Sequence, residues 1–512
     1  MLAKVISSAT LGVDAYPVEV EADIQQQMPA FVTVGLPEGA VRESKERVTA
    51  AIKNSDFVFP VKRVTINLAP ADVKKEGSAF DLPIAVGILA ATGQIIRERV
   101  DEFVLVGELS LDGSLKPVPG VLPMAMSLHE GNGIKGMIVP KENAREAAMA
   151  GTVPVFPVYS LKQAVHFLED ESTIRQFDVD IASVFNEARK YPIDFSDVKG
   201  QESAKRALEI AAAGGHNIIM IGPPGSGKTM LARRMPTILP DMSVAEALET
   251  TKIHSVAGRL GPEEPLVATR PFRSPHHTVS YAGLVGGGTI PKPGEVSLAH
   301  HGVLFLDEMP EFKKDILEML RQPMEDKQVT ISRASTALTY PASFMLVAAM
   351  NPCPCGYYGD PQHECHCSSG EIQRYMSRVS GPLLDRIDIH ITVPSVKFKE
   401  LSSEAKGENS SEIRKRVNAA RQLQLRRFQS EPNIFANAHM EPCDIRRFCK
   451  IDEKSHSLLA LAITRQGLSA RAYDRILKVA RTIADLAASE SIEMGHIAEA
   501  IHYRTLDRNL WL

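Results

Sequence analysis

The stretch that decides the fold is "IGPPGSGKTM", which occupies residues 221–230. An apolar run ends at Ile221, and the helix-compatible run "MLARRM" (230–235) follows the glycines. The spacing matches G-x-x-x-x-G-K-[ST], a phosphate-binding loop (P-loop) between a strand and a helix. Backbone N–H groups and the helix N-terminus attract phosphate, while Lys228 is expected to reach the β/γ-phosphates and Thr229 to bind Mg²⁺. The alternative is a glycine-rich turn without a ligand, which the Lys-Thr pair disfavours. The predicted cofactor-binding residues are Gly222, Pro223, Pro224, Gly225, Ser226, Gly227, Lys228 and Thr229.

A second apolar run also ends in residues suited to this chemistry. In "GVLFLDEMPEF" (302–312), the strand-like segment 303–306 is followed by Asp307 and Glu308. Beside a P-loop, such an aspartate binds Mg²⁺ and such a glutamate polarises the attacking water. The alternative is an ordinary acidic strand end. The two motifs predict an ATP and Mg²⁺ site in which Thr229 and Asp307 hold the metal and Glu308 is catalytic.

Two more polar residues stand where they can act on the same phosphates. The run "FMLVAAMNP" (344–352) is a third apolar strand, and Asn351 near its end can orient the attacking water. In "GLSARAYDRILKVAR" (467–481), Arg471 begins a predicted helix and can bend back to the γ-phosphate. The alternative for Arg471 is a solvated position at a helix start. Asn351 and Arg471 are therefore candidate catalytic residues.

Arg386 is the candidate for a catalytic contribution from a second chain. It follows a short helical turn in "GPLLDRIDIHITV" (381–393). An arginine at this place can stabilise charge on the γ-phosphate bound by a neighbouring subunit. The alternative is a salt bridge within the chain, to Asp385 or Asp388. Arg386 acting in trans is the main indication of an oligomer in the residues themselves.

Length and composition indicate an ordinary soluble protein with several domains. The chain has 512 residues, of which 44% are apolar and 23% charged, and its net charge is −4. This length suits about two to four domains. No apolar run is long enough to span a membrane, and the first residues lack the apolar core of a signal peptide. The six cysteines are too few for a disulfide scaffold. We therefore expect a cytoplasmic protein with no membrane partner.

The pattern of elements predicts four segments of an α/β protein. Residues 1–168 alternate short strands with helices and form an α+β domain, and residues 169–193 form an acidic linker. Residues 194–396 carry the strand–loop–helix pattern of a P-loop core, and residues 397–512 are almost wholly helical. A parallel sheet is expected in the core because strands alternate with helices there.

These elements, in this order, resemble an AAA+ ATPase core followed by a helical lid. The stretches "FRSPHHTVSYAGLVGGG" (272–288), "NPCPCGYYGD" (351–360) and "SGPLLDRIDIH" (380–390) are similar to the Mg-chelatase-like branch of AAA+ proteins, and the whole chain resembles the ComM/YifB family. The resemblance implies a homo-hexameric ring, an insertion between the two nucleotide motifs, and a hairpin that points into the ring channel. That hairpin would be "KQVTISRASTALTYPAS" (327–343).

The N-terminal domain resembles the proteolytic domain of Lon, which has a ribosomal S5 domain 2-like fold. The resemblance rests on "PADVKKEGSAFDLPIAVGIL" (70–89) and "GELSLDGSLKPVPGVLPMA" (107–125). Lon-type chemistry needs a serine that is activated by a lysine. Ser78 lies within one residue of the serine position, but Leu122 occupies the lysine position. We therefore expect a non-catalytic domain in which Ser78 is a helix N-cap.

Four of the six cysteines follow Asn351 closely, in the pattern C-x-C-x9-C-x-C. Four thiolates can close a tetrahedral zinc site, although the usual spacing is C-x-x-C. Prolines and glycines surround the cluster, as expected of a small loop that needs a metal to hold it. A structural zinc site is predicted, with free thiols or a redox switch as alternatives, and His363 or His366 could replace one ligand. The candidate ligands are Cys353, Cys355, Cys365 and Cys367.

Three functions fit such an ATPase. The ComM resemblance implies a helicase-like ring motor that promotes branch migration when incoming single-stranded DNA is integrated during natural transformation. Lys327 and Arg333, in the candidate channel hairpin, are then expected to contact phosphates of single-stranded or branched DNA; the basic helix 414–428 is a weaker candidate. The second function is a motor subunit for metal insertion into a porphyrin, although such subunits lack the Lon-like domain. The third is protein remodelling, for which Tyr281 is a weak pore-loop candidate.

Overall fold

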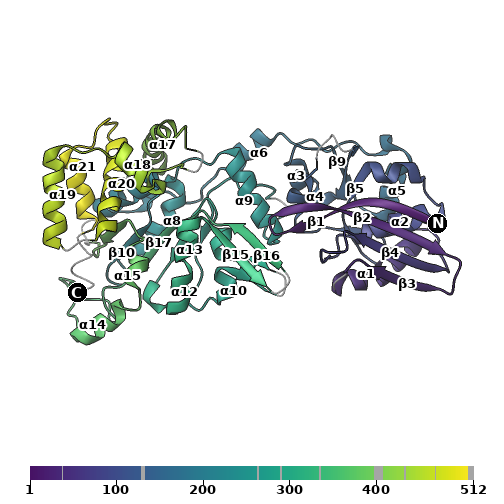
Figure 1. Ribbon diagram of the computed structural model, residues 1–512, viewed down its shortest axis with the longest axis horizontal. Helices are drawn as coiled ribbons and strands as arrows, with labels where there is room; N and C mark the ends of the chain where they lie inside the picture. The colour runs from purple at the N-terminus through teal and green to yellow at the C-terminus, as the bar shows by residue number, and fades with distance from the viewer. Residues whose placement is uncertain are drawn as a thin grey trace. The chain divides into compact units, whose positions relative to one another are not determined.

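The computed structural model describes residues 1–36, 39–75, 77–128, 133–261, 264–288, 291–333, 336–396, 407–431, 434–466 and 469–504. The chain divides into two compact units. The first comprises Met1–Arg189 together with Val244–Ala268, and the second comprises Lys190–Ser243 together with Thr269–Leu512. Each unit has its own sheet with helices beside it (Figure 1), so the predicted α/β class is confirmed.

The first unit is built on a mixed sheet of seven strands. The pairs β1–β2 and β2–β4 are antiparallel, and the other neighbours are parallel. Alternate residues of β4 are fully buried (Val64, Ile66 and Leu68), as expected of a strand with one face on a core. In sheet order the strands are β3 (Ala30–Val34), β4 (Arg63–Ala69), β2 (Asp14–Gln25), β1 (Leu2–Leu11), β5 (Phe103–Leu105), β8 (Gly136–Pro140) and β9 (Val155–Val158).

Helix α2 (Asp81–Thr92) forms the centre of this unit's core. Its residues from Asp81 to Ala91 are all buried. Gly87 lets the helix approach the sheet closely, because a Cβ there would lie 3.3 Å from the Ala22 Cβ. Gly93, with φ of 72°, ends the helix in the left-handed conformation that glycine adopts readily. The unit also contains α1 (Gly39–Asn54), the hairpin β6 (Glu108–Leu109) and β7 (Leu115–Lys116), α3 (Val121–Met126), α4 (Lys141–Ala148), α5 (Leu161–Glu169) and α6 (Ile181–Ala188).

The residues at the Lon-like positions do not form a serine–lysine pair. Ser78 is not the N-cap that we expected: the N-cap of α2 is Phe80, and the Ser78 hydroxyl donates a hydrogen bond to Glu108. Leu122 is buried in α3, and its N–H donates to the Glu146 carboxylate at 3.0 Å. The serine thus bonds to a carboxylate, which accords with a domain that does no peptidase chemistry.

The insertion between the two nucleotide motifs packs within the first unit. Its helix α9 (Val244–Val256) presents Ser255, whose hydroxyl donates to Glu146 Oε1 at 2.5 Å. Lys252 of the same helix lies 3.6 Å from the Asp14 carboxylate. Burial raises the pKa of Glu146, so this polar contact lies inside the unit rather than on its surface. The chain therefore leaves the nucleotide-binding unit after α8 and contributes a helix to the other unit.

The second unit contains a parallel sheet of five strands. Its three central strands are buried along their whole length, which is typical of a sheet that is covered on both faces. Since the strands are parallel, their carboxyl ends lie along one edge, where ligands of open α/β sheets bind. In sheet order the strands are β11 (Phe272–Arg273), β14 (Val303–Leu306), β17 (Met345–Met350), β10 (Ile218–Ile221) and β18 (Ile389–Thr392).

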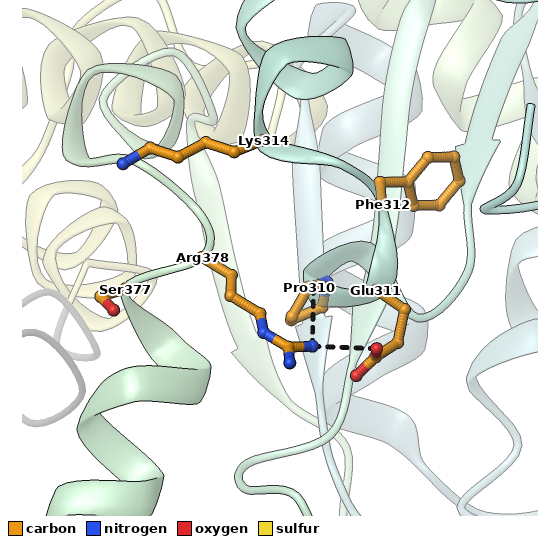
Figure 2. A pocket seen from close by; sticks show the side chains of 6 residues that line it. All are labelled: Pro310, Glu311, Phe312, Lys314, Ser377 and Arg378. Carbon is orange, nitrogen blue, oxygen red and sulfur yellow. Dashed lines mark hydrogen bonds and ion pairs between the residues drawn. The ribbon is translucent and has the colours of Figure 1, made fainter. Parts of the chain in front are cut away.

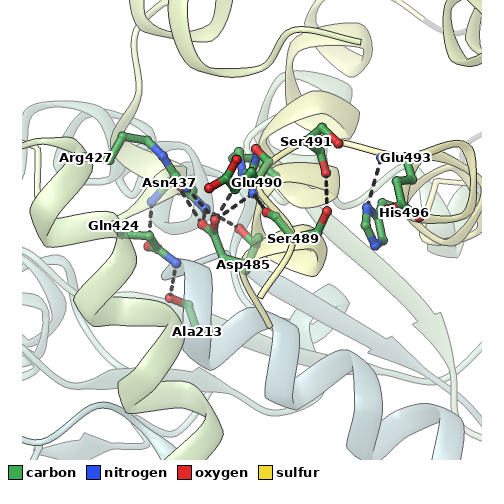
Figure 3. A network of polar contacts seen from close by, with 12 residues as sticks. Ala213, Gln424, Arg427, Asn437, Asp485, Ser489, Glu490, Ser491, Glu493 and His496 are labelled. Atoms are coloured by element: carbon green, nitrogen blue, oxygen red, sulfur yellow. Dashed lines mark hydrogen bonds and ion pairs between the residues drawn. The ribbon is translucent and has the colours of Figure 1, made fainter. Parts of the chain in front are cut away.

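Five C-terminal helices form the predicted lid, drawn in green to yellow in Figure 1. A buried polar network holds two of them together (Figure 3): the Asp485 carboxylate accepts hydrogen bonds from Arg427, Arg481 and Asn437. Gln424 donates to the Ala213 carbonyl at 3.1 Å and so connects the lid to α7. The lid helices are α17 (Ser410–Arg427), α18 (Pro442–Phe448), α19 (Glu453–Gln466), α20 (Ala470–Leu486) and α21 (Met494–His502).

The remaining elements of the second unit surround the sheet. The hairpin of β15 (Gln328–Arg333) and β16 (Thr336–Pro341) lies between β14 and β17 in the chain, where a channel hairpin was expected. No helix among the described ranges is long and apolar enough to cross a membrane. The other elements are α7 (Glu202–Gly214), α8 (Lys228–Ile238), α10 (Tyr281–Leu284), β12 (Gly286–Gly287), β13 (Lys292–Pro293), α11 (Glu295–Leu298), α12 (Lys314–Met319), α13 (Arg321–Asp326), α14 (Ser369–Met376) and α15 (Gly381–Leu384).

Candidate nucleotide site

The P-loop has the backbone that a phosphate cradle requires. Gly225 and Gly227 have φ of 74° and 86°, a left-handed conformation that other residues adopt at a cost. A Cβ at Gly222 would lie 2.1 Å from the Val393 carbonyl oxygen, so only glycine fits there. Gln201 braces the loop from outside, since its side chain donates to the Ser226 carbonyl at 2.5 Å. Sequence reasoning missed Gln201 because no local pattern links it to the loop.

Lys228 is buried at the start of α8 and points back across the loop. Its amine donates to the carbonyls of Gly222 at 2.7 Å and Pro223 at 2.9 Å. It also lies 3.2 Å from Asn351 Oδ1. Burial lowers the pKa of Lys228 to about 8, although Asp307 and Glu308 partly oppose this effect. The Lys228 amine therefore contacts both the P-loop and Asn351, with the charges of Asp307 and Glu308 nearby.

The metal-binding pair and the glutamate lie at the end of β14. The Thr229 hydroxyl donates to Asp307 Oδ2 at 2.7 Å, which brings together the two side chains expected to bind Mg²⁺. Glu308 follows in a left-handed conformation with φ of 50°, which is uncommon for a residue with a side chain. His277 Nδ1 lies 3.9 Å from its carboxylate, a contact that sequence reasoning did not assign.

These groups fit a nucleoside triphosphate with Mg²⁺. The helix N-terminus, the left-handed glycines and the Lys228 amine supply positive potential for phosphate. Thr229 and Asp307 supply the oxygen ligands that Mg²⁺ prefers. Glu308 is 59% exposed and can therefore meet water. Asn351 completes the set because β17 and β10 are neighbouring strands whose carboxyl ends meet.

A pocket of about 480 Å³ lies along the segment that follows Glu308 (Figure 2). Arg378 reaches across it and bonds to Glu311 at 2.9 Å and, more weakly, to the Pro310 carbonyl at 3.4 Å. None of its lining residues belongs to the P-loop, so the phosphate site is the loop itself and not this pocket. The lining residues are Pro310, Glu311, Phe312, Lys314, Ser377 and Arg378.

The two candidate catalytic arginines, Arg471 and Arg386, each make an ion pair within the chain, but with different partners. Arg471, at the start of α20, is 66% exposed, and its guanidinium lies 3.6 Å from Asp385. Arg386 is only 10% exposed in its side chain and pairs with Glu325 at 2.5 Å. The alternative of a salt bridge within the chain is therefore realised, but with Glu325 instead of Asp385 or Asp388.

Asp388 instead joins the end of the sheet to the lid. Its buried carboxylate accepts from Arg475 of α20 and lies 3.2 Å from the His216 ring. Burial raises the pKa of Asp388, but Arg475, His216 and Lys478 outweigh burial and hold the pKa well below its usual range. The ionised carboxylate thus fixes α20, the helix that carries Arg471, to the nucleotide-binding core.

The cysteine cluster comes together in space. All four sulfurs lie within 4.8 Å of one another. Cys353 Sγ is 3.3 Å from that of Cys355 and 3.7 Å from that of Cys365, and Cys355 and Cys365 are 3.6 Å apart. A Cβ on Gly356, in the same loop, would lie 2.5 Å from Pro224, so the loop packs directly against the P-loop. The cluster could therefore influence the nucleotide site.

The predicted DNA-binding residues take different positions in the hairpin. Lys327 caps α13 with φ of 54° at the hairpin's base, and burial lowers its pKa. Arg333 is the last residue of β15, and its side chain lies outside the part of the chain that the structure describes. Two arginines of the basic helix α17 make ion pairs within the chain: Arg416 pairs with Glu209 at 2.6 Å, and Arg427 pairs with Asp485.

Comparison with known proteins covers nearly the whole chain. Three family models match in order: "Subunit ChlI of Mg-chelatase" over residues 20–143, "Magnesium chelatase, subunit ChlI" over 194–401, and "Magnesium chelatase, subunit ChlI C-terminal" over 407–504. The chain is similar to competence protein ComM of Haemophilus influenzae and to YifB of Escherichia coli, at 44% identity in both cases, over 99% of this chain and 98% of each relative.

The N-terminal part has a further similarity, to Lon protease 2 of Bacillus subtilis. The two are 32% identical over 154 residues, which is 28% of this chain and 27% of that protease. This agrees with the Lon-like resemblance predicted for the first domain. With relatives this similar over nearly their full length, the chain belongs to the ComM/YifB family of Mg-chelatase-like AAA+ proteins.

Proposed function

We propose that this chain is an ATP-hydrolysing ring motor that acts on DNA, with helicase or branch-migration activity during natural transformation in the cytoplasm. The observation that carries the proposal is the convergence of Lys228, Thr229, Asp307 and Asn351 at one edge of the parallel sheet. Family membership implies the use of ATP and Mg²⁺. The similarity to a competence protein supports DNA as the substrate.

The side chains divide the work in a defined way. Lys228 would exchange its loop carbonyls for the β- and γ-phosphates, and Thr229 with Asp307 would hold Mg²⁺, whose charge would offset that of the phosphates. Glu308 takes up the orientation that polarises the attacking water, and Asn351 orients the same water. In a homo-hexameric ring, Arg386 of a neighbouring subunit stabilises the charge that develops on the γ-phosphate. Arg471 acts on the same γ-phosphate from the lid.

The cysteine cluster is proposed to hold one structural zinc ion. With Zn–S distances of about 2.3 Å, tetrahedral ligands lie roughly 3.8 Å apart. The spacings of 3.6 and 3.7 Å are close to this value, and the 3.3 Å spacing requires only a small outward shift. A backbone hydrogen bond from Tyr357, together with the neighbouring thiols, lowers the pKa of Cys355 to about 6, so one thiolate is available to start binding.

The substrate is tested by measuring ATP turnover against DNA concentration at two salt levels. Single-stranded or forked DNA is expected to raise turnover several-fold at low salt, and the effect should fall steeply at high salt because phosphate contacts release counterions. Arg333→Glu should remove this stimulation and keep basal turnover, since Arg333 ends a hairpin strand and makes no part of the P-loop. Lys454→Glu, at an exposed position of α19, serves as the matched control, because α19 is not a DNA-binding candidate.

A flat response to every DNA at low salt, by a confirmed oligomer that hydrolyses ATP, would contradict the DNA proposal. It would favour a protein-remodelling ATPase or a metal-chelatase motor subunit. The metal-chelatase alternative is supported by the three family models, which are named for a magnesium chelatase subunit. Stimulation by unfolded protein, or by a porphyrin-binding partner subunit, would then separate the two.

A further inference from the structure

Arg386 is held inside its own chain by two contacts. Its Nη2 pairs with Glu325 Oε1 at 2.5 Å, and its Nη1 donates to the Pro382 carbonyl at 2.7 Å. The side chain is 10% exposed, and its Nε has no hydrogen-bond acceptor among the described residues. A guanidinium fixed in this way does not project freely from the surface, as it must to reach the γ-phosphate of another subunit.

Glu325 belongs to the element that leads directly into the hairpin. It lies in the last turn of α13, one residue before Asp326 ends the helix, and Lys327 then turns the chain into β15 (Figure 1). Only two residues separate Glu325 from the first strand residue, Gln328. A displacement of the hairpin must therefore move the carboxylate that holds Arg386.

The hairpin itself is anchored on one face. Val329 and Ile331 are buried, and the Tyr340 hydroxyl donates to the Pro291 carbonyl at 2.6 Å. A Cβ on Gly286 would lie 2.6 Å from the Ile331 side chain, so the strand packs closely on the loop beside it. These contacts tie one face of the hairpin to the segment beside it, so we expect the two to move together and to carry a displacement to the base of the hairpin.

We propose that Glu325 is a positioning residue that restrains Arg386 until a polymer in the ring channel displaces the hairpin. The proposal rests on the proposed function, in which Arg386 acts on a neighbouring subunit. Loading of the hairpin moves Glu325, the ion pair opens, and Arg386 becomes available to the adjacent nucleotide. In the proposed function this polymer is DNA, an anionic chain that passes through without being read by sequence.

The geometry makes this restraint releasable. Glu325 is 58% exposed, so its carboxylate is readily solvated when it leaves the guanidinium. The Pro382 carbonyl that accepts from Nη1 belongs to α15, four residues before Arg386, so this contact is not tied to the hairpin. Opening of the Glu325 contact frees Nη2, and this contact is the one that links Arg386 to the hairpin.

The test uses the full chain in four forms: wild type, Glu325→Gln, Arg386→Ala, and the double variant. Basal and DNA-stimulated ATP turnover are measured after light scattering has confirmed equal oligomeric states. Glu325→Gln is expected to raise basal kcat roughly two- to fivefold, the range that loss of a partly exposed ion pair allows. Its KM for ATP should stay unchanged, and its ratio of DNA-stimulated to basal turnover should fall. The double variant should be as slow as Arg386→Ala.

Asp326→Asn is the matched control, because it removes the same charge from the next residue. Asp326 is exposed and makes no ion pair among the described residues, so its variant should behave as wild type. The proposal is overturned if Glu325→Gln has the basal turnover of the wild type and the same ratio of DNA-stimulated to basal turnover. DNA stimulation of the wild type would then still support the proposed function. An equal gain in Asp326→Asn would also overturn it. If DNA does not raise ATP turnover of the wild type, the DNA proposal is refuted separately. A higher basal kcat in Glu325→Gln would then still support the restraint of Arg386 by Glu325.

Discussion

At the scale of single residues, Lys228 is a buried group that the proposed phosphate binding would contact directly. Its buried amine bonds to the Gly222 and Pro223 carbonyls, and burial lowers its pKa to about 8. Phosphate oxygens close to the amine favour its charged form and so raise the pKa. Binding above pH 8 must therefore take up a proton, whereas binding below pH 8 needs none.

This linkage predicts that ATP affinity falls as pH rises through the pKa of the free amine. Between pH 7 and pH 9 the loss should be about tenfold, because the charged fraction of a group with pKa 8, which is the form that binds phosphate, falls by about that factor. Titration of a fluorescent ATP analogue across this range measures it. Lys228→Arg is the control: it should bind more weakly but with no pH dependence, since arginine stays charged. The same slope in both proteins would assign the effect to another group.

The residue scale also shows what local sequence could and could not predict. The P-loop, the Asp307–Glu308 pair and Asn351 are each part of a strand end, and parallel strands bring such ends together, so their meeting was predictable. The partner of Arg386 was not. Glu325 lies in another helix far away in the sequence, and only the packing of α13 brings it within 2.5 Å. His277, 3.9 Å from Glu308, was missed for the same reason.

At the scale of elements, the cysteine loop and the P-loop pack directly against each other. Gly356 packs against Pro224 so closely that a Cβ has no room, and the four sulfurs gather in the same loop. A metal that holds the sulfurs together should therefore also hold the P-loop in place. Structural zinc contributes directly to folding energy in loops that lack a core of their own.

Elemental analysis of protein purified without added zinc is expected to find about one zinc per chain, held by four thiolates. Cys365→Ser should lower this content and weaken ATP binding, because the loop that supports Pro224 loosens. Cys443→Ser is the matched control, since Cys443 is exposed and lies outside the cluster. A metal-free wild type with full ATP binding and four rapidly titrated thiols in the loop would remove the zinc site.

Elements also mark where prediction of the fold ended. The alternation of short strands and helices over residues 1–168 was predicted from the sequence, as was the helical C-terminal region. The placement of α9 was not: residues 244–268 lie between two nucleotide motifs yet pack in the first unit through Ser255 and Glu146. Nothing in the sequence of α9 indicates that it packs in the first unit, because the fit between elements that are distant in the chain depends on the tertiary structure.

At the scale of the whole molecule, the proposed ring is a feature that a single chain cannot complete. If Arg386 acts on the neighbour, Lys228→Ala and Arg386→Ala damage opposite halves of a shared site. Mixing the two inactive variants should restore some ATP turnover, because a fraction of the interfaces then pairs an intact P-loop with an intact arginine. Turnover is measured across mixing ratios with co-assembly confirmed by cross-linking. No recovery in mixed rings would place the action of Arg386 within its own subunit.

The central claim is that ATP hydrolysis at this P-loop drives movement on DNA, and migration of a labelled three-stranded DNA joint tests it most directly. The wild-type ring should resolve the joint only with ATP and Mg²⁺. Glu308→Gln should bind ATP and the joint but leave it unresolved, because an amide cannot polarise the attacking water. Resolution by Glu308→Gln at the wild-type rate, or no resolution by an assembled wild-type ring that is hydrolysing ATP on the same DNA, would contradict the account.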